Sequence, residues 1–255
     1  SLDLTGLPPT RQEIADFLND ETGEAYEHVV DRLLGQVQYG EHMARYWLDL
    51  VRFADTNGIH HDHFREVTPY RDWVIRAFND NLRFDRFVEH QVAGDLYKDA
   101  TLDQQIASGF NRLHLVIDKG TALPAESFAR NVIDRVTAFG TAFLGLTLQC
   151  AVCHDHKYDP ITQRDFYRLY AFFNNIDAGP ETPGSGIHAP FVRVPTAAQA
   201  AELEELQTAN VKLDAAGAAL QETLADLGGA DGDNGAISAV ATAVKDALAA
   251  VQSAG

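Results

Sequence analysis

The sequence predicts a mainly α protein in which a multi-helix domain is followed by an α-helical hairpin. Hydrophobic residues recur at helical spacing in many segments, and several of these segments begin with a good capping residue. A Pro- and Gly-rich stretch then separates them from a region rich in Ala and Glu. We therefore divide the 255 residues into a helical domain (1–178), a linker (179–195) and a hairpin (196–255).

The first part of the domain contains a series of short predicted helices. Thr10 and Glu13 have the spacing of a capping box, which places a helix start at Thr10. Residues 35–40 are predicted to form a turn, and Thr101 is predicted to cap a later helix. After the helix at Thr10, the predicted helices cover about 25–34, 41–55, 69–78, 84–93 and 101–107.

The later helices frame the only two cysteines of the chain. Residues 113–121 are predicted to form a loop, with a small β element around 113–117 or 191–194 as the alternative. Pro124 then begins a long predicted helix that runs toward Leu148. Thr162 caps the next helix, whose aromatic face consists of Phe166, Tyr167, Leu169, Tyr170, Phe172 and Phe173. In the hairpin, helices are predicted over 196–227 and 236–254, joined by a Gly-rich turn. We interpret this hairpin as a spacer or as an oligomerisation arm.

The composition argues against several classes of function. A net charge of −17 and a pI of about 4.8 describe an acidic surface, which repels the phosphate backbone of nucleic acids and anionic membranes. No run of about 18 apolar residues exists, so no membrane span is expected. The chain opens like the interior of a longer protein and shows no signal peptide, so we expect a mature or excised fragment.

The strongest functional signal is the motif formed by Cys150, Cys153 and His154. Two cysteines three residues apart, with histidine directly after the second, have the spacing of c-type haem attachment. The two thiols can add to the haem vinyl groups, and the His154 imidazole can then bind the iron from the proximal side. The motif therefore predicts one covalently attached haem c.

Three other interpretations of these cysteines compete with haem attachment. A redox disulfide expects a thioredoxin-like strand and helix around the pair, and no such alternation surrounds it. A structural zinc ion could use Cys150, Cys153, His154 and His156, but zinc sites usually take ligands from two separated segments. The third interpretation is a pair of free buried thiols.

A second histidine-rich segment follows Gly58. His60, His61 and His63 lie in a predicted loop, and no hydrophobic periodicity accounts for them. The simplest interpretation is a solvated polar loop. The alternatives are that one imidazole reaches the haem iron from the distal side, or that two imidazoles bind a second metal with Asp62 or Asp55. An open sixth position or a second histidine is favoured over the lone methionine, Met43, as the sixth ligand.

The residues directly after His154 also allow two interpretations. His156 and Tyr158 either turn the chain before Pro160, or lie over the haem edge and bond to a propionate. We predict only that they lie close to the cofactor.

Five segments carry distinctive motifs, residues 4–10, 46–55, 70–75, 145–160 and 164–175. Through these motifs the sequence resembles the DUF1549 family, the planctomycete-type cytochrome c proteins also called PSCyt2 domains. The resemblance covers about residues 2–177 and implies haem attachment at Cys150 and Cys153 with His154 as proximal ligand. Family members are large secreted or periplasmic proteins, commonly joined to another cytochrome c-like domain and to carbohydrate-binding-like modules. This setting implies a redox role near polysaccharide breakdown. Residues 1–255 include none of those partner domains, and the histidine loop is richer than the family suggests.

Three functional hypotheses follow. The first is an extracytoplasmic c-type cytochrome domain that exchanges electrons with a redox partner protein or a fused cytochrome domain. The second is a haem-dependent oxidoreductase that uses peroxide or oxygen on a carbohydrate-derived or small organic substrate. The third is a scaffold domain with structural zinc or another non-haem metal. For the second hypothesis, the candidate catalytic residues are His60, His61, His63, His156 and Tyr158.

Overall fold

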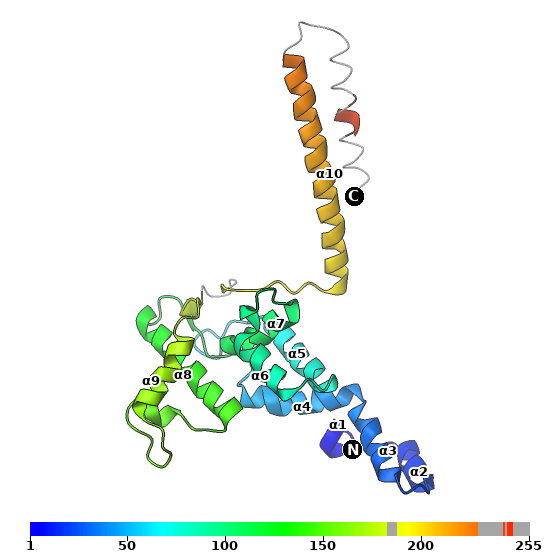
Figure 1. The fold of residues 1–255 in the computed structure, drawn as a ribbon, viewed down its shortest axis with the longest axis vertical. Coiled ribbons are helices and arrows are strands. Elements are labelled where there is room, and N and C mark those ends of the chain that lie inside the picture. Colours follow the sequence, from blue (N-terminus) through cyan, green and yellow to red (C-terminus); the bar gives the residue numbers. More distant parts are fainter. Residues whose placement is uncertain (183–187, 229–241, 243, 247–255) are drawn as a thin grey trace. The chain divides into compact units, whose positions relative to one another are not determined.

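The computed structural model describes residues 1–182, 188–228, 242 and 244–246, and it divides into two units, Ser1–Val192 and Arg193–Gly255 (Figure 1). Helices form most of the described chain, which confirms the predicted mainly α class. The predicted second arm of the hairpin, residues 236–254, lies outside the described residues apart from 242 and 244–246.

Unit 1 begins with three helices, α1 (Leu2–Thr5), α2 (Arg11–Asn19) and α3 (Ala25–Leu34). The predicted capping box is present at the start of α2. The Glu13 amide donates to the Thr10 hydroxyl at 3.2 Å, and the Thr10 amide donates to the Glu13 carboxylate at 2.7 Å. The short helix α1 was not predicted, because four residues are too few to show helical periodicity.

The central part of unit 1 consists of α4 (Val37–Leu50), α5 (Thr68–Asn79), α6 (Phe84–Ala93), η1 (Gly94–Leu96), α7 (Leu102–Ala107) and η2 (Ser108–Arg112). The predicted turn at 35–40 was wrong in its second half, because α4 already begins at Val37. Gly40 is needed inside this helix, since a Cβ there would stand 2.4 Å from the carbonyl oxygen of Ile75 in α5. The glycine therefore marks a close helix–helix approach rather than a turn.

These elements enclose the first hydrophobic core. Phe87 lies in its centre, stacked on Trp73 with ring centroids 5.3 Å apart and edge-to-face with Trp47 at 4.8 Å. Gln91 is fully buried beside them, and its side-chain oxygen accepts hydrogen bonds from the Trp47 indole and the Tyr70 hydroxyl. The polar ends of the buried aromatic side chains are thus satisfied.

The second core lies around α8 (Pro124–Phe139) and α9 (Gln163–Phe173), shown side by side in green and yellow-green in Figure 1. The predicted long helix ends earlier than expected. It passes into a π-helical turn, η3 (Gly140–Leu144), and stops at Gly145, which adopts a left-handed conformation. Of the predicted aromatic face on α9, Phe166 and Phe173 are buried in this core, whereas Tyr167 and Phe172 are exposed.

Two short strands complete unit 1. β1 (Ile117–Asp118) pairs in parallel with β2 (Glu181–Thr182), with Asp118 opposite Thr182. The strand β1 lies in the segment predicted to be a loop, and β2 lies within the stretch expected to be the linker. This stretch also contacts α8, because the Asn131 amide donates to the carbonyl of Pro180 at 3.0 Å.

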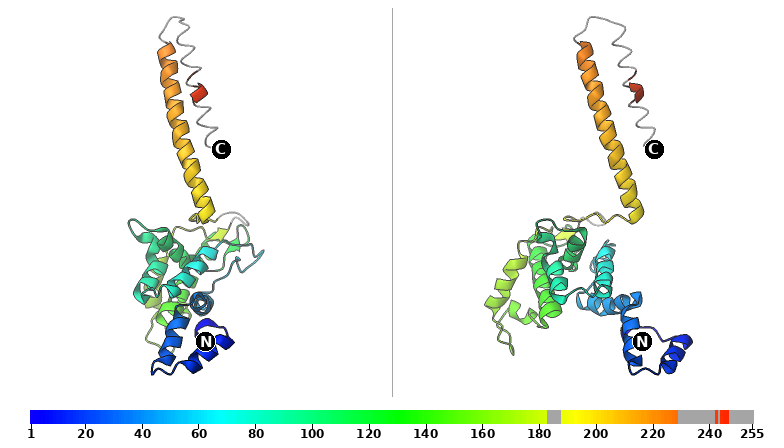
Figure 2. Two further views of the ribbon diagram at one scale, coloured as in Figure 1. Left: turned by 90° about the vertical axis from the view of Figure 1, so that its right-hand side faces the viewer. Right: turned by 45° about the vertical axis from the view of Figure 1, so that its right-hand side comes forward.

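Unit 2 contains one long described helix, α10 (Ala197–Gly228), which is continuous in both views of Figure 2. Thr196 begins it by accepting a hydrogen bond from the Gln199 amide at 3.3 Å. Its leucines Leu203, Leu206 and Leu213 are each about half exposed. The predicted oligomerisation through this region therefore stays a prediction.

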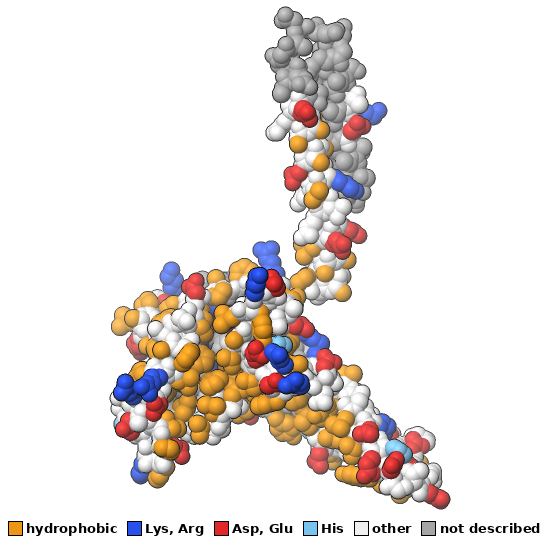
Figure 3. All heavy atoms as spheres, in the orientation of Figure 1, with side chains coloured by type: hydrophobic (Ala, Val, Ile, Leu, Met, Phe, Trp, Pro, Cys, Tyr) orange, Lys and Arg blue, Asp and Glu red, His pale blue; other side chains and the backbone are white. Residues whose placement is uncertain are grey.

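Unit 1 exposes a considerable apolar surface. Figure 3 shows hydrophobic side chains gathered on one of its faces, and its exposed large hydrophobic residues include Val37, Tyr46, Phe64, Phe84 and Leu96. No helix within the described ranges is both long and apolar enough to cross a membrane.

Candidate functional site

Cys150 lies in a short 3-10 helix, η4 (Gln149–Val152), between η3 and α9, and Cys153 is the residue that ends this helix. A 3-10 helix has three residues per turn, so residues three apart point the same way. Leu148 and Ala151 point into the second core, where they are 4% and 0% exposed. Cys150 and Cys153 follow the same spacing on a different side of the helix axis, and both cysteines are exposed and free of a disulfide.

His154 follows the second cysteine at the surface. Its Nδ1–H donates to the carbonyl oxygen of Asp155 at 2.7 Å. This hydrogen bond fixes the tautomer and leaves the Nε2 lone pair as the atom that can bind a metal. Two exposed thiols on one side of a short helix, followed by an oriented imidazole, therefore fit the attachment of a c-type haem.

His156 organises the loop that returns the chain to α9. Its side chain is only 8% exposed, and its Nδ1 accepts hydrogen bonds from the backbone amides of Asp159 at 2.9 Å and Tyr158 at 3.3 Å. The His156 amide donates to Ile161 at 2.8 Å. Nδ1 is thus occupied as an acceptor, so His156 forms the turn that the sequence offered as one of two interpretations.

The start of α9 holds the cysteine turn, residues 149–154, in place. The hydroxyl of Tyr167 donates to the carbonyl of Val152 at 3.0 Å, between the two cysteines. The amide of Gln163 donates to Asp155 at 2.7 Å. Two hydrogen bonds therefore tie the turn to α9, and Tyr158, in the loop before this helix, is 82% exposed.

The geometry is less suited to a zinc ion held by Cys150, Cys153, His154 and His156. Within the described ranges, ligand atoms of three candidate side chains approach to within 4.8 Å of one another in one group, and that group does not include this turn.

That one group involves the histidine loop, the segment predicted after Gly58 that carries His60, His61 and His63. His60 and His61 both direct Nδ1 at the same oxygen of Asp118, Oδ2, at 3.1 and 2.6 Å. His63 places Nε2 at 3.6 Å from the same atom. The three histidines therefore converge on one carboxylate instead of standing as a solvated loop.

The carboxylate partner differs from the two that the sequence suggested. Asp62 accepts a hydrogen bond from the Gly58 amide at 2.6 Å, and the carbonyl of Asp55 accepts one from Arg65 at 2.7 Å. Both residues shape the loop, whereas Asp118 reaches it from β1. Hydrogen bonding from His60 and His61, with the nearby charge of His63, lowers the pKa of Asp118 against the opposing effect of burial.

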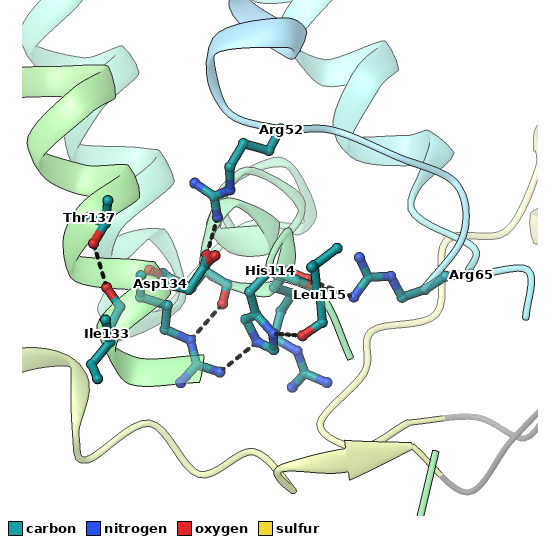
Figure 4. Close-up of polar contacts among 10 residues, drawn as sticks. Arg52, Arg65, His114, Leu115, Ile133, Asp134 and Thr137 are labelled. Atoms are coloured by element: carbon teal, nitrogen blue, oxygen red, sulfur yellow. Dashed lines mark hydrogen bonds and ion pairs between the residues drawn. The ribbon is translucent and has the colours of Figure 1, made fainter. Parts of the chain in front are cut away.

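A buried polar network surrounds His114, in the segment that leads to β1. Figure 4 shows Arg65 directed toward His114, with the partly exposed pair Arg52 and Asp134 nearby. The network holds two further arginines, Arg112 and Arg135, and burial lowers the pKa of Arg65, Arg112 and Arg135 to about 10.

His114 is the neutral centre of this network. Arg135 donates to its Nε2 at 3.0 Å, and its Nδ1–H donates to the Leu115 carbonyl at 3.0 Å. Burial, reinforced by the positive charge of Arg135, lowers the pKa of His114 to about 3. Arg65 also donates to the carbonyls of Arg112 and His114, and so joins the histidine loop to the segment that leads to Asp118.

Sequence reasoning missed both Asp118 and His114. Neither belongs to a local motif, and both lie in the segment 113–121 that was predicted to be a loop. The one available signal was the apolar pair Val116 and Ile117 directly before Asp118, a pattern that fits a short buried strand ending in a polar group.

Comparison with known proteins identifies a family but no annotated relative. The family model described as "Protein of unknown function (DUF1549)", PSCyt2, matches residues 1–178. No curated protein and no solved structure is significantly similar to the chain. The matched region contains the cysteine turn, the histidine loop and both hydrophobic cores. The chain therefore belongs to the DUF1549 (PSCyt2) family.

Proposed function

We propose that unit 1 is an extracytoplasmic c-type cytochrome domain that carries one haem on Cys150 and Cys153. The observation that carries the proposal is the pair of exposed, unpaired thiols on one side of η4, followed by His154 with Nε2 uncommitted. When bound, the haem supplies one-electron chemistry at its iron.

The protein residues have distinct roles in this proposal. Cys150 and Cys153 hold the cofactor as thioethers, and His154 binds the iron through Nε2, because its Nδ1 is held by the carbonyl of Asp155. His156 keeps the following loop closed through the amides of Tyr158 and Asp159. The exposed position of the turn brings the cofactor close to the surface, where a redox partner protein or a fused cytochrome domain can approach.

Electron transfer is favoured over catalysis by the positions of the candidate catalytic residues. His60, His61 and His63 are directed at Asp118, and His156 is bonded to the backbone. General acid–base catalysis beside an open iron position needs a group free to reach the substrate. The exposed Tyr158 is the remaining candidate for a haem oxidoreductase acting on a carbohydrate-derived or small organic substrate.

The proposal also implies a compartment. Thioether attachment of haem takes place outside the cytoplasm, so we place the protein in the periplasm or among secreted proteins.

The test is expression with export through a cytochrome c maturation system, followed by absorption spectroscopy and intact mass measurement. We expect a Soret band and a mass gain of one haem that survives denaturation. The matched control is the double variant Cys150→Ser/Cys153→Ser, which should show neither. Colourless wild-type protein without added mass, containing stoichiometric zinc, would contradict the proposal and favour a structural metal.

A second measurement separates the electron carrier from the enzyme. Carbon monoxide is added to the reduced haem protein at neutral pH. Inertness indicates two strong axial ligands and supports electron transfer, whereas rapid binding indicates an open position and favours the oxidoreductase. Tyr158→Phe would then show whether the phenol contributes to turnover.

A further inference from the structure

We propose that His60, His61 and Asp118 form a binding site for a divalent cation of the zinc type, with His63 as a fourth donor. This site is separate from the cysteine turn and does not depend on the proposed haem. It lies where the histidine loop meets the end of β1.

The separations of the donor atoms suit such an ion. Nδ1 of His61 and His60 and Nε2 of His63 lie 2.6, 3.1 and 3.6 Å from Oδ2 of Asp118. Ligand atoms about 2.1 Å from a tetrahedral zinc ion stand ~3.4 Å apart. Adjustments of less than about 1 Å in these distances to Asp118 would therefore convert the hydrogen-bonded cluster into a coordination shell.

An independent observation points to a missing partner. The Asp118 side chain is only 9% exposed, and its second oxygen, Oδ1, is buried without a hydrogen-bond partner in the described part of the chain. A buried carboxylate oxygen without a partner is costly, and such an atom calls for an explanation such as an unobserved ion. A cation bound by Asp118 would satisfy this carboxylate.

The loop is built so that its histidines face one point. Gly58, His60 and Asp62 all have positive φ angles, of 78°, 63° and 51°. Left-handed conformations of non-glycine residues are energetically unfavourable and tend to occur at functional sites. Here they coil the backbone so tightly that the rings of His60 and His61 lie with their centroids 4.0 Å apart.

The rest of the fold anchors both halves of the site. The loop is closed by pairing between Thr56 and Phe64, and the Val116 amide donates to Asn57 at 3.2 Å. Asp118 is held two residues further along, in β1. The donors are therefore positioned before any ion binds, which reduces the entropy lost on binding.

The donor set determines which ions would bind. Imidazole suits zinc, copper and nickel, and two histidines with one carboxylate leave positions for water or another ligand. The side chain of His61 is 66% exposed and that of His60 is 38% exposed, so solvent and ions can reach the site. Magnesium and calcium prefer ligand sets made entirely of oxygen, so they should bind poorly to this site.

Zinc titration by calorimetry tests the proposal, using the full chain with Cys150→Ser/Cys153→Ser so that thiols cannot bind the metal. We expect one equivalent of zinc to bind saturably and to raise the thermal unfolding midpoint. In this background, His61→Ala and Asp118→Asn should each weaken binding at least tenfold. His61 is well exposed, so its replacement should leave the fold intact.

The matched control is His28→Ala. Like His61, His28 is well exposed (55%) and bonds to a carboxylate, with its Nδ1 2.9 Å from Asp20. It belongs to no three-donor group of the described chain. This variant should bind zinc like its parent. The proposal would be overturned if the parent showed no saturable zinc binding, or if His61→Ala and Asp118→Asn bound zinc as tightly as the parent does. Either result leaves the haem proposal unaffected, because the parent lacks both cysteines.

Discussion

The cysteine turn and the histidine loop are built in opposite ways. Cys150, Cys153 and His154 lie close together in the sequence, and the 3-10 helix η4 orients the cysteines away from a packed core. In the histidine loop, His61 meets Asp118 across a sequence separation of 57 residues. The first site consists of local geometry on a rigid support, whereas the second exists only when distant segments are correctly folded. Mutations at and around the two sites should therefore differ in how much they change the free energy of unfolding.

The largest effect is expected from removing the support beneath the turn. Phe166 is 1% exposed in the core that also contains Leu148 and Ala151. Phe166→Ala should lower the free energy of unfolding by about 3–5 kcal/mol, through lost burial and the cavity left behind. Urea unfolding measures this change. A loss below about 1 kcal/mol, the range of ordinary surface substitutions, would show that the turn is not supported by this core.

The second-largest effect is expected at acidic pH, where His114, a buried residue near the histidine loop, should lower the stability of the protein. The pKa of His114 is about 3 in the folded protein, against 6.5 for the free side chain. Between these values the unfolded chain binds a proton that the folded chain does not, so stability falls as pH decreases. Through His114, the free energy of unfolding should fall by ~1.6 kcal/mol as the pH decreases from 6.5 to 5.

His114→Gln tests this contribution, because glutamine can still accept from Arg135 and donate to the Leu115 carbonyl. We expect the stability of this variant to decrease less between pH 6.5 and 5 than that of the wild type, measured by urea unfolding at both pH values. An unchanged slope would mean that His114 titrates normally in the folded protein.

A smaller effect should come from the loop itself. Gly58→Ala places a Cβ 2.4 Å from Leu115 Cδ2 at a residue with φ of 78°. The left-handed conformation alone should cost about 1–2 kcal/mol. Gly120→Ala is the matched control, because Gly120 has φ of 83° with no atom within 4 Å of the added Cβ. Equal losses of thermal stability in the two variants would show that Leu115 moves aside freely.

The smallest effect is expected at the cysteines. Both thiols are exposed and unpaired, so Cys150→Ser/Cys153→Ser should change the free energy of unfolding of the haem-free chain by less than about 0.5 kcal/mol. Chemical denaturation of both haem-free proteins measures the difference. A loss comparable to that of Phe166→Ala would remove the distinction between a local site and its support.

The same contrast explains what could be predicted from the sequence. Helix starts at Thr10, Thr101 and Thr162 were predicted correctly, because a capping box depends on residues three apart. The Cys150–His154 spacing was recognisable for the same reason. The start of α4 was misplaced, since the role of Gly40 depends on Ile75 in another helix.

The histidine loop lay between these cases. Its three imidazoles were visible as an unusual cluster, but no local pattern connects them to the carboxylate that they share. Asp118 is brought there by the pairing of a two-residue strand and by contacts between Asn57 and Val116. Such short, long-range elements carry almost no sequence periodicity, and so the partner could be found only in the folded structure.

The outward position of the cysteines has a consequence for the order of events during biogenesis. Both hydrophobic cores close without either thiol and without His154. On the proposed function, the polypeptide can therefore fold first and receive its cofactor afterwards, as a finished surface offered to the attachment machinery. A newly exported chain would then be compact before haem is attached, and a shortage of haem would leave folded protein without its cofactor.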